Sequence, residues 1–73
     1  MNVDQVKTAL LNNVENEQTQ DDGVWGSVYL DNARFDLKIS KHSFAGYLSA
    51  LEGRGEYRQS PDDDGYFGRV KVS

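Results

Sequence analysis

The chain contains no cysteine, no long apolar segment and no leader of the kind that directs secretion. Because cysteine is absent from its 73 residues, neither a disulfide framework nor a zinc-thiolate site can stabilise the fold. No apolar run approaches the roughly 18 residues of a membrane span. The start, MNVDQVKTALLNN, has neither a basic leader nor a small-residue cleavage site. The sequence therefore predicts a soluble, cytoplasmic protein without a membrane partner.

The length allows one small domain, residues 1–73, near the lower limit for folding without disulfides or metals. A single hydrophobic core of this size rarely contributes more than roughly 3 to 5 kcal/mol of net stability. We therefore expect either a homodimer or a monomer of low stability.

Basic residues are scarce in the first half of the chain. Lys7 is the only Lys or Arg among residues 1–33, which hold six acidic residues. Residues 34–73 hold seven basic and six acidic residues, and the net charge of the chain is −4. Nucleic-acid binders usually concentrate Lys and Arg, so this distribution argues against a simple one. It predicts a molecule that is acidic at one end and weakly basic on one face.

The first half of the chain predicts a helix followed by two strands. Apolar residues recur at helical spacing over residues 3–15, which indicates an amphipathic helix. Residues 16–23 (NEQTQDDG) contain no apolar residue and are predicted to form a loop. Residues 24–30 and 34–40 alternate apolar and polar side chains, as strands do, and Asn32 suits a tight turn between them.

A second helix is predicted in the second half. Ser40 or Ser43 can cap its start, and Gly53 stands where a helix end is expected. Gly46 lies inside this helix, where glycine costs about 1 kcal/mol relative to alanine, so we expect it to allow close packing on the sheet. The apolar face of this helix consists of Phe44, Tyr47, Leu48 and Leu51.

Residues 55–60 and 65–72 are predicted to form a second hairpin around the turn at residues 61–64 (PDDD), with Arg58 opposite Phe67. The predicted fold class is therefore α+β, in the order α-β-β-α-β-β. The sheet is expected to have four strands, to be mainly antiparallel, and to carry both helices on one face.

Successive strand side chains point to opposite faces, so this sheet should have two unlike faces. The face predicted to form the core carries Val24, Val28, Leu30, Phe35, Leu37, Ile39, Tyr66, Val70 and Val72. The opposite face is aromatic and basic and carries Trp25, Tyr29, Lys38, Arg58, Phe67, Arg69 and Lys71.

The aromatic and basic face is the main candidate for partner binding. Trp, Tyr and Arg are enriched among the residues that dominate protein interfaces. Aromatic rings beside Lys and Arg could equally stack the bases of a single-stranded nucleic acid, although Asp36 and Glu56 are predicted on the same face and would repel its backbone. A purely structural alternative is that Trp25 covers the sheet edge or packs on the first helix. The predicted partner-binding residues are Trp25, Tyr29, Arg58, Phe67, Arg69 and Lys71.

An acidic surface is the secondary candidate, formed by Glu15, Glu17, Asp21 and Asp22. The simplest interpretation is a solvated helix end and loop. The functional alternative is an anionic surface that contacts a basic partner or occupies a nucleic-acid groove by imitating phosphate spacing.

Two features that suggest catalysis or metal binding have simpler explanations. Asp62, Asp63, Asp64 and Gly65 resemble part of a calcium loop, but Lys71 then falls where the loop needs a bidentate glutamate. These residues are typical of a hairpin turn. His42, the only histidine, lies near the start of the second helix without a neighbouring nucleophile. The sequence predicts no catalytic residue, no metal site and no cofactor.

The expected function is therefore non-enzymatic binding of a macromolecule, with a protein as the favoured partner. Small acidic proteins without cysteine are of the kind that phages and mobile elements use to inhibit host defence or nucleic-acid-processing enzymes, so inhibition is one expected form of binding. The alternative is a single-stranded nucleic-acid-binding module that uses the face of Trp25, Tyr29 and Phe67. A more distant one is an enzyme that holds a divalent metal on its clustered aspartates.

Overall fold

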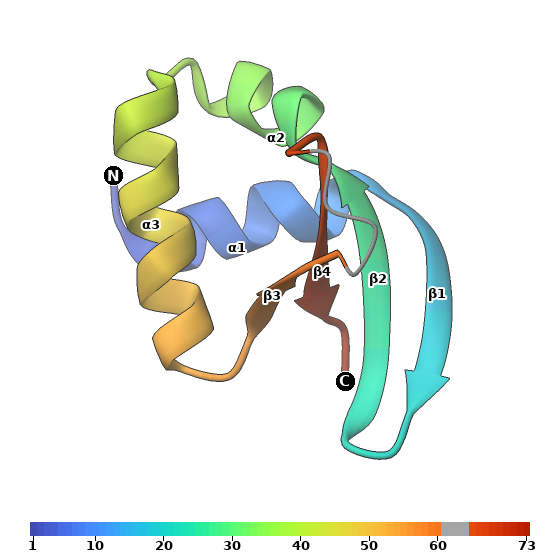
Figure 1. Ribbon diagram of the computed structural model, residues 1–73. Coiled ribbons are helices and arrows are strands. Elements are labelled where there is room, and N and C mark those ends of the chain that lie inside the picture. Colours follow the sequence, from blue (N-terminus) through green and yellow to red (C-terminus); the bar gives the residue numbers. More distant parts are fainter. Residues whose placement is uncertain (61–64) are drawn as a thin grey trace.

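The structure is a computed structural model that describes residues 1–60 and 65–73. The elements within these residues are α1 (Val3–Asn12), β1 (Val14–Gln20), β2 (Gly23–Tyr29), α2 (Leu30–Leu37), α3 (Lys41–Gly53), β3 (Tyr57–Gln59) and β4 (Phe67–Lys71). The four described strands form one antiparallel sheet in the order β1-β2-β4-β3. The helices lie together on one side of this sheet (Figure 1). The predicted α+β class is confirmed.

Helix α1 begins where its sequence indicates and ends earlier than predicted. Asn2 caps the helix: its side chain accepts a hydrogen bond from the Gln5 backbone N–H, and the Gln5 side chain accepts one from the Asn2 N–H. The buried face of α1 packs into the core, but the helix stops at Asn12 and Val14 opens a strand. None of the helices among the described residues is long and apolar enough to cross a membrane.

Strand β1 occupies most of the segment that was predicted to be a loop. Residues 21–22 form a two-residue turn between β1 and β2. Gln20 pairs with Gly23 beside this turn, and Val14 pairs with Val28 at the far end of the hairpin. Gly23 has a φ of 134°, a conformation that glycine adopts without the steric cost of a side chain. The prediction was wrong because it relied on apolar alternation, whereas backbone pairing with β2 holds this exposed and polar strand.

Helix α2 replaces the strand predicted at residues 34–40. Leu30, Ala33 and Leu37 recur at helical spacing, and all three contact the core. The same conformation turns Phe35, which was predicted to be a core residue, outward with 62% of its surface exposed. Lys38 ends the helix in the left-handed conformation, with a φ of 56° and a ψ of 43°. Periodicity alone does not separate the two states in so short a segment.

The second half largely follows the predictions. Ser40 caps α3, which ends at Gly53, and a hairpin follows. Arg58 pairs with Arg69 instead of Phe67, a shift of two residues that leaves the predicted faces of the sheet unchanged. The turn predicted at residues 61–64 lies outside the described residues.

The core lies between the helices and the sheet. Tyr66, which was predicted to belong to it, is 53% exposed, and Val72 is 38% exposed. Within the core the Tyr57 ring lies over Gly68, where an added Cβ would come within 2.6 Å of the Tyr57 Cε1 atom. The buried core residues are Val6, Ala9, Leu10, Val28, Ala33, Phe44, Leu51, Tyr57 and Val70.

Candidate functional site

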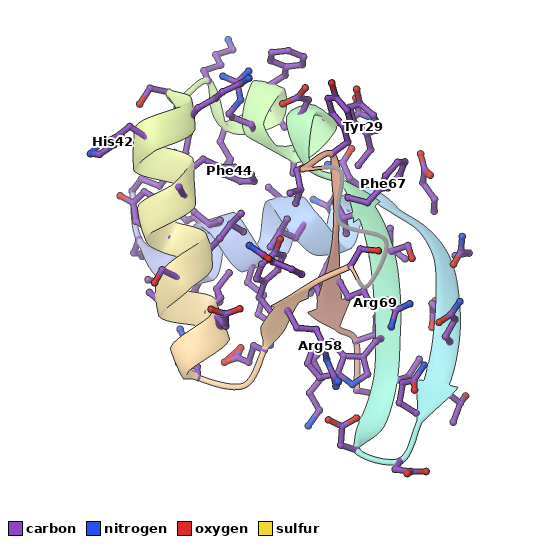
Figure 2. The ribbon with its side chains drawn as sticks, in the orientation of Figure 1. Tyr29, His42, Phe44, Arg58, Phe67 and Arg69 are labelled. Atoms are coloured by element: carbon purple, nitrogen blue, oxygen red, sulfur yellow. The ribbon has the colours of Figure 1, made fainter. Side chains whose placement is uncertain are left out.

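The candidate site is the sheet face opposite the buried core, here called the outer face. Strands β2 and β4 supply it in cross-strand pairs: Trp25 opposite Lys71, Ser27 opposite Arg69, and Tyr29 opposite Phe67. Strand β3 adds Arg58 beside Arg69. Figure 2 shows Tyr29 and Phe67 together at the end of these strands near α2, with Arg58 toward the opposite end. The predicted partner-binding residues therefore share one face.

One end of the outer face carries a cluster of three side chains that each contact the other two: Trp25, Arg58 and Asp22. The Arg58 guanidinium lies 3.6 Å from the centre of the Trp25 ring and 2.6 Å from the Asp22 Oδ2 atom. The Trp25 indole N–H donates a hydrogen bond to Asp22 Oδ1 at 3.0 Å. This hydrogen bond, followed by the interaction with Arg58, holds the pKa of Asp22 below its ordinary value. Trp25 is only 4% exposed, so it is covered by its neighbours.

Three aromatic residues gather at the other end of the outer face. The rings of Tyr29 and Phe67 meet edge to face, with their centres 5.3 Å apart. Tyr66 stacks nearly parallel to Tyr29 at 6.3 Å and is 53% exposed. Tyr29 and Phe67 are themselves half-buried. This aromatic cluster is apolar surface that the sheet leaves accessible. Tyr66 was not among the predicted site residues because strand alternation assigned it to the core.

The middle of the outer face carries positive charge that no described carboxylate neutralises. Arg58 and Arg69 stand directly opposite each other, an arrangement that is unfavourable for two like charges. Arg58 turns to Asp22, whereas neither Arg69 nor Lys71 has an ion pair with any described residue. Both side chains are half-buried. The two cations are therefore held on the face without an anionic partner in the described part of the chain.

The two carboxylates that were predicted on this face lie elsewhere. Asp36 is in α2 and accepts a hydrogen bond from the Asn13 side chain. Glu56 binds the Lys7 ammonium at 2.6 Å and the Arg54 guanidinium at 2.9 Å, beside α1 and the end of α3. Lys7 first and Arg54 second hold the pKa of Glu56 below its ordinary value. Lys38, also predicted on the face, caps α2.

The acidic residues lie along an edge of the sheet. Glu15 and Glu17 are exposed on β1, and Asp21 is exposed in the turn that follows. None of these three forms an ion pair within residues 1–60 and 65–73, whereas Asp22 is engaged by Arg58. The predicted acidic surface is therefore a strand edge with its turn, and Asp22 belongs to the outer face instead.

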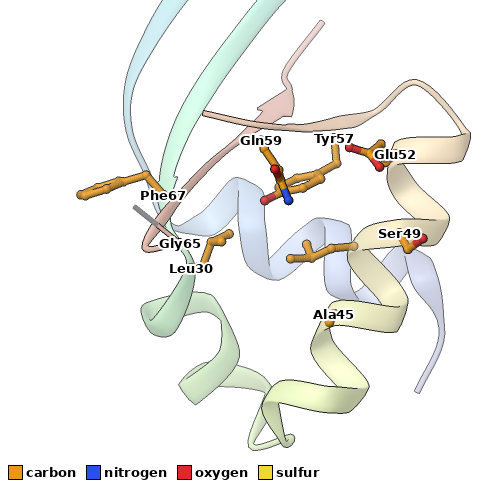
Figure 3. A pocket seen from close by; sticks show the side chains of 9 residues that line it. Leu30, Ala45, Ser49, Glu52, Tyr57, Gln59, Gly65 and Phe67 are labelled. Atoms are coloured by element: carbon orange, nitrogen blue, oxygen red, sulfur yellow. The ribbon is translucent and has the colours of Figure 1, made fainter. Parts of the chain in front are cut away.

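A cleft that the sequence did not indicate lies between α3 and the β3–β4 hairpin (Figure 3). It has a volume of about 310 Å³, and the Tyr57 side chain points into it from β3. Its polar lining comes from Ser49, Glu52, Tyr57 and Gln59, and Glu52 is the only charged group among the described lining residues. Such a lining can accommodate a small polar group, but it does not form an acid–base pair.

The described residues do not form a metal site. No three His, Cys, Asp or Glu side chains in this part of the chain lie close enough together to hold a metal ion. Asp62, Asp63 and Asp64 lie outside the described residues. His42 is exposed in the first turn of α3 and points away from the molecule (Figure 2).

No protein-family model, curated protein or solved structure matches this chain. The functional argument therefore depends on the geometry of the outer face and of the acidic edge.

Proposed function

We propose that this chain is a non-enzymatic binding protein that holds another protein against its outer face. The observation that carries the proposal is the position of Arg69. It lies at the centre of the face, half-buried, across from Arg58 and without an ion pair among the described residues. The aromatic cluster of Tyr29, Tyr66 and Phe67 lies at one end of the face. A partner that contributes a carboxylate to Arg69 and an apolar side chain to the rings complements both features.

The charge around the outer face favours a protein partner over a nucleic acid. The adjacent strand β1 contains no Lys or Arg, and the whole chain has a net charge of −4. A phosphate backbone extending across the sheet would meet no further cation on β1, whereas a protein surface can carry charges of both signs.

Single-stranded nucleic acid is the second candidate, favoured by one observation. Asp36 and Glu56, which were predicted to repel a nucleic acid, are held away from the outer face by other contacts. Arg69 and Lys71 beside accessible rings are a suitable arrangement for stacking bases and holding phosphates.

We further propose that binding acts by occupying the partner's surface. Stoichiometric inhibitors that phages or mobile elements direct at host defence or nucleic-acid-processing enzymes work in this way. The support for this part of the proposal is the analogy of small size and acidic charge.

Capture experiments with matched charge variants test the proposal. Arg69→Ala and Lys41→Ala each remove one positive charge, but Lys41 lies on α3 and not on the outer face. A tagged wild-type chain is expected to retain a protein that Arg69→Ala binds about 30-fold less tightly and that Lys41→Ala binds normally. Circular dichroism melts of both variants serve as the control for folding. Nuclease treatment and rising salt should leave this complex intact.

Three results would contradict the proposal. Equal weakening by Arg69→Ala and Lys41→Ala would show that only net charge matters. Loss of the captured material after nuclease treatment, with a steep salt dependence, would establish the nucleic-acid alternative. Sedimentation that detects only a homodimer held through Arg69 would assign the face to self-association, one of the two states expected for so small a core.

A further inference from the structure

The edge of β1 that faces away from β2, here called the outer edge, is unpaired in the described structure. Strand β1 is the first strand of the sheet order and pairs with β2 on one side only. The pairing shifts register between Val14 and Asn16, and beyond this bulge alternate backbone N–H and C=O groups of the antiparallel strand point away from β2. Six of its seven residues are exposed. Figure 1 shows the β1–β2 hairpin extending beyond the helices, so β1 forms an accessible edge of the molecule.

The charge of this edge is entirely negative. Residues 8–33, which include the whole hairpin, contain no Lys, Arg or His. Glu15 and Glu17 on β1 and Asp21 in the turn are exposed and have no ion pair with a described residue. Glu17 also stands opposite Gly26, which offers no side chain on β2. A strand added outside β1 would therefore meet free carboxylates beside free backbone groups.

These observations favour a basic strand over a second copy of the chain. If two β1 edges paired antiparallel around Asn16, Glu15 of each copy would face Glu17 of the other. Pairing around Glu17 would place the two Glu17 carboxylates opposite each other. Like charges directly opposite destabilise a strand pair, whereas Lys or Arg at the same positions stabilises it.

We propose that β1 accepts an extended, Lys- or Arg-rich segment of a partner protein as a fifth strand of the sheet. The added strand pairs its backbone with the outer edge of β1 and places its cations beside Glu15 and Glu17. This proposal specifies the partner chemistry of the acidic edge and rests on the proposed function, but it uses a different surface from the Arg69 face.

Titration with short peptides tests this proposal. The probe is an end-blocked octapeptide of alternating Lys and Thr, and its control has Glu in place of Lys. In nuclear magnetic resonance spectra, the Lys peptide should shift the β1 amides and slow their hydrogen exchange, while the Glu peptide leaves them unchanged. Glu17→Gln should weaken binding about two- to fivefold, the effect of one cross-strand ion pair. Glu52→Gln, an equal charge change on α3, should have no such effect.

The proposal for the outer face and the proposal for the β1 edge can be supported or rejected separately in this experiment. Arg69→Ala should leave the Lys peptide bound to β1, even where it abolishes capture of the partner by the outer face. The inference is overturned if the Lys peptide shifts no β1 amide. It is also overturned if Glu17→Gln and Glu52→Gln weaken binding equally, because the attraction is then one of net charge. Concentration-dependent shifts of the β1 amides without peptide would assign the edge to a second copy.

Discussion

Trp25 shows how a residue on the expected face can have a different role from the expected one. It lies on the outer face as predicted, but Arg58 covers its ring and Asp22 accepts its N–H, so it is 4% exposed. A buried tryptophan is part of the stability of the fold. An incoming partner can touch the outer surface of Arg58 more readily than the indole beneath it.

We therefore expect Trp25→Ala to cost about 3 to 5 kcal/mol of unfolding free energy, the usual range for a buried tryptophan. A single core of this size supplies a similar amount, so the variant should be largely unfolded at room temperature. Phe67→Ala, at a half-buried position on the same face, should cost less. Circular dichroism melts of both variants provide the comparison, and an equal loss of stability would contradict the assignment.

Gly46 is a helical glycine that the structure does not require. The expected close packing on the sheet is wrong, because a Cβ added there would meet no described atom within 4 Å outside the adjoining residues and backbone of its own helix. Gly46→Ala should therefore stabilise the chain by about 0.5 to 1 kcal/mol through higher helix propensity.

Urea unfolding measures this gain. The contrasting variant is Gly68→Ala, which should be destabilised because the new Cβ overlaps the Tyr57 ring. A Gly46→Ala variant that is less stable than the wild type would show that a neighbour absent from the described contacts, such as a partner, packs at this position.

At the scale of elements, the sequence correctly predicted the segments whose apolar spacing fits only a helix or only a strand. Helices α1 and α3, strand β2 and the β3–β4 hairpin were anticipated, and so was the face to which Trp25 and Arg69 belong. Strand β1 was missed because it contributes hydrogen bonds and little apolar surface. Helix α2 was missed because the spacing of the apolar residues in this segment fits a strand as well as a helix. In the candidate site, the burial of Trp25 could not be predicted. It depends on Asp22, which binds both Trp25 and Arg58, and no local sequence pattern connects Asp22 to Arg58.

The end of α2 offers a test of its helical conformation. Lys38 adopts the left-handed conformation with a φ of 56°, which costs a residue with a Cβ roughly 1 to 2 kcal/mol. We expect Lys38→Gly to stabilise the chain by about 1 kcal/mol, because glycine is the preferred residue at such helix ends. Lys38→Ala, which removes the charge but keeps the Cβ, should not. Urea unfolding of the two variants separates these effects, and an equal response would show that the charge is responsible.

At the scale of the whole molecule, two ion-pair clusters connect distant segments of the described chain. Asp22 joins the β1–β2 turn to Arg58 of β3, and Glu56 joins the start of β3 to Lys7 of α1. In both, hydrogen bonds and nearby cations lower the pKa of the carboxyl group. Their contribution to stability is therefore complete above the unfolded pKa, about 4 for these side chains, and is lost as the pH falls through the folded pKa.

Melting temperatures measured between pH 7 and pH 3 test this linkage. The wild type should lose stability across the acid range, and a variant that combines Asp22→Asn with Glu56→Gln should start lower and lose less. Glu52→Gln serves as the control for a single exposed carboxylate. An identical decline in the wild type and the double variant would show that other carboxylates govern acid unfolding.

The Tyr57 ring that lies over Gly68 constrains how this sequence can diverge. The two residues come from β3 and β4 and share a single volume inside the core, because the ring occupies the space that any side chain at position 68 would need. A larger residue at position 68 is compatible with the fold only if position 57 becomes smaller in the same lineage. In any collection of descendants from this chain, natural or selected in the laboratory, we expect a replacement of Gly68 to be accompanied by a smaller residue at position 57.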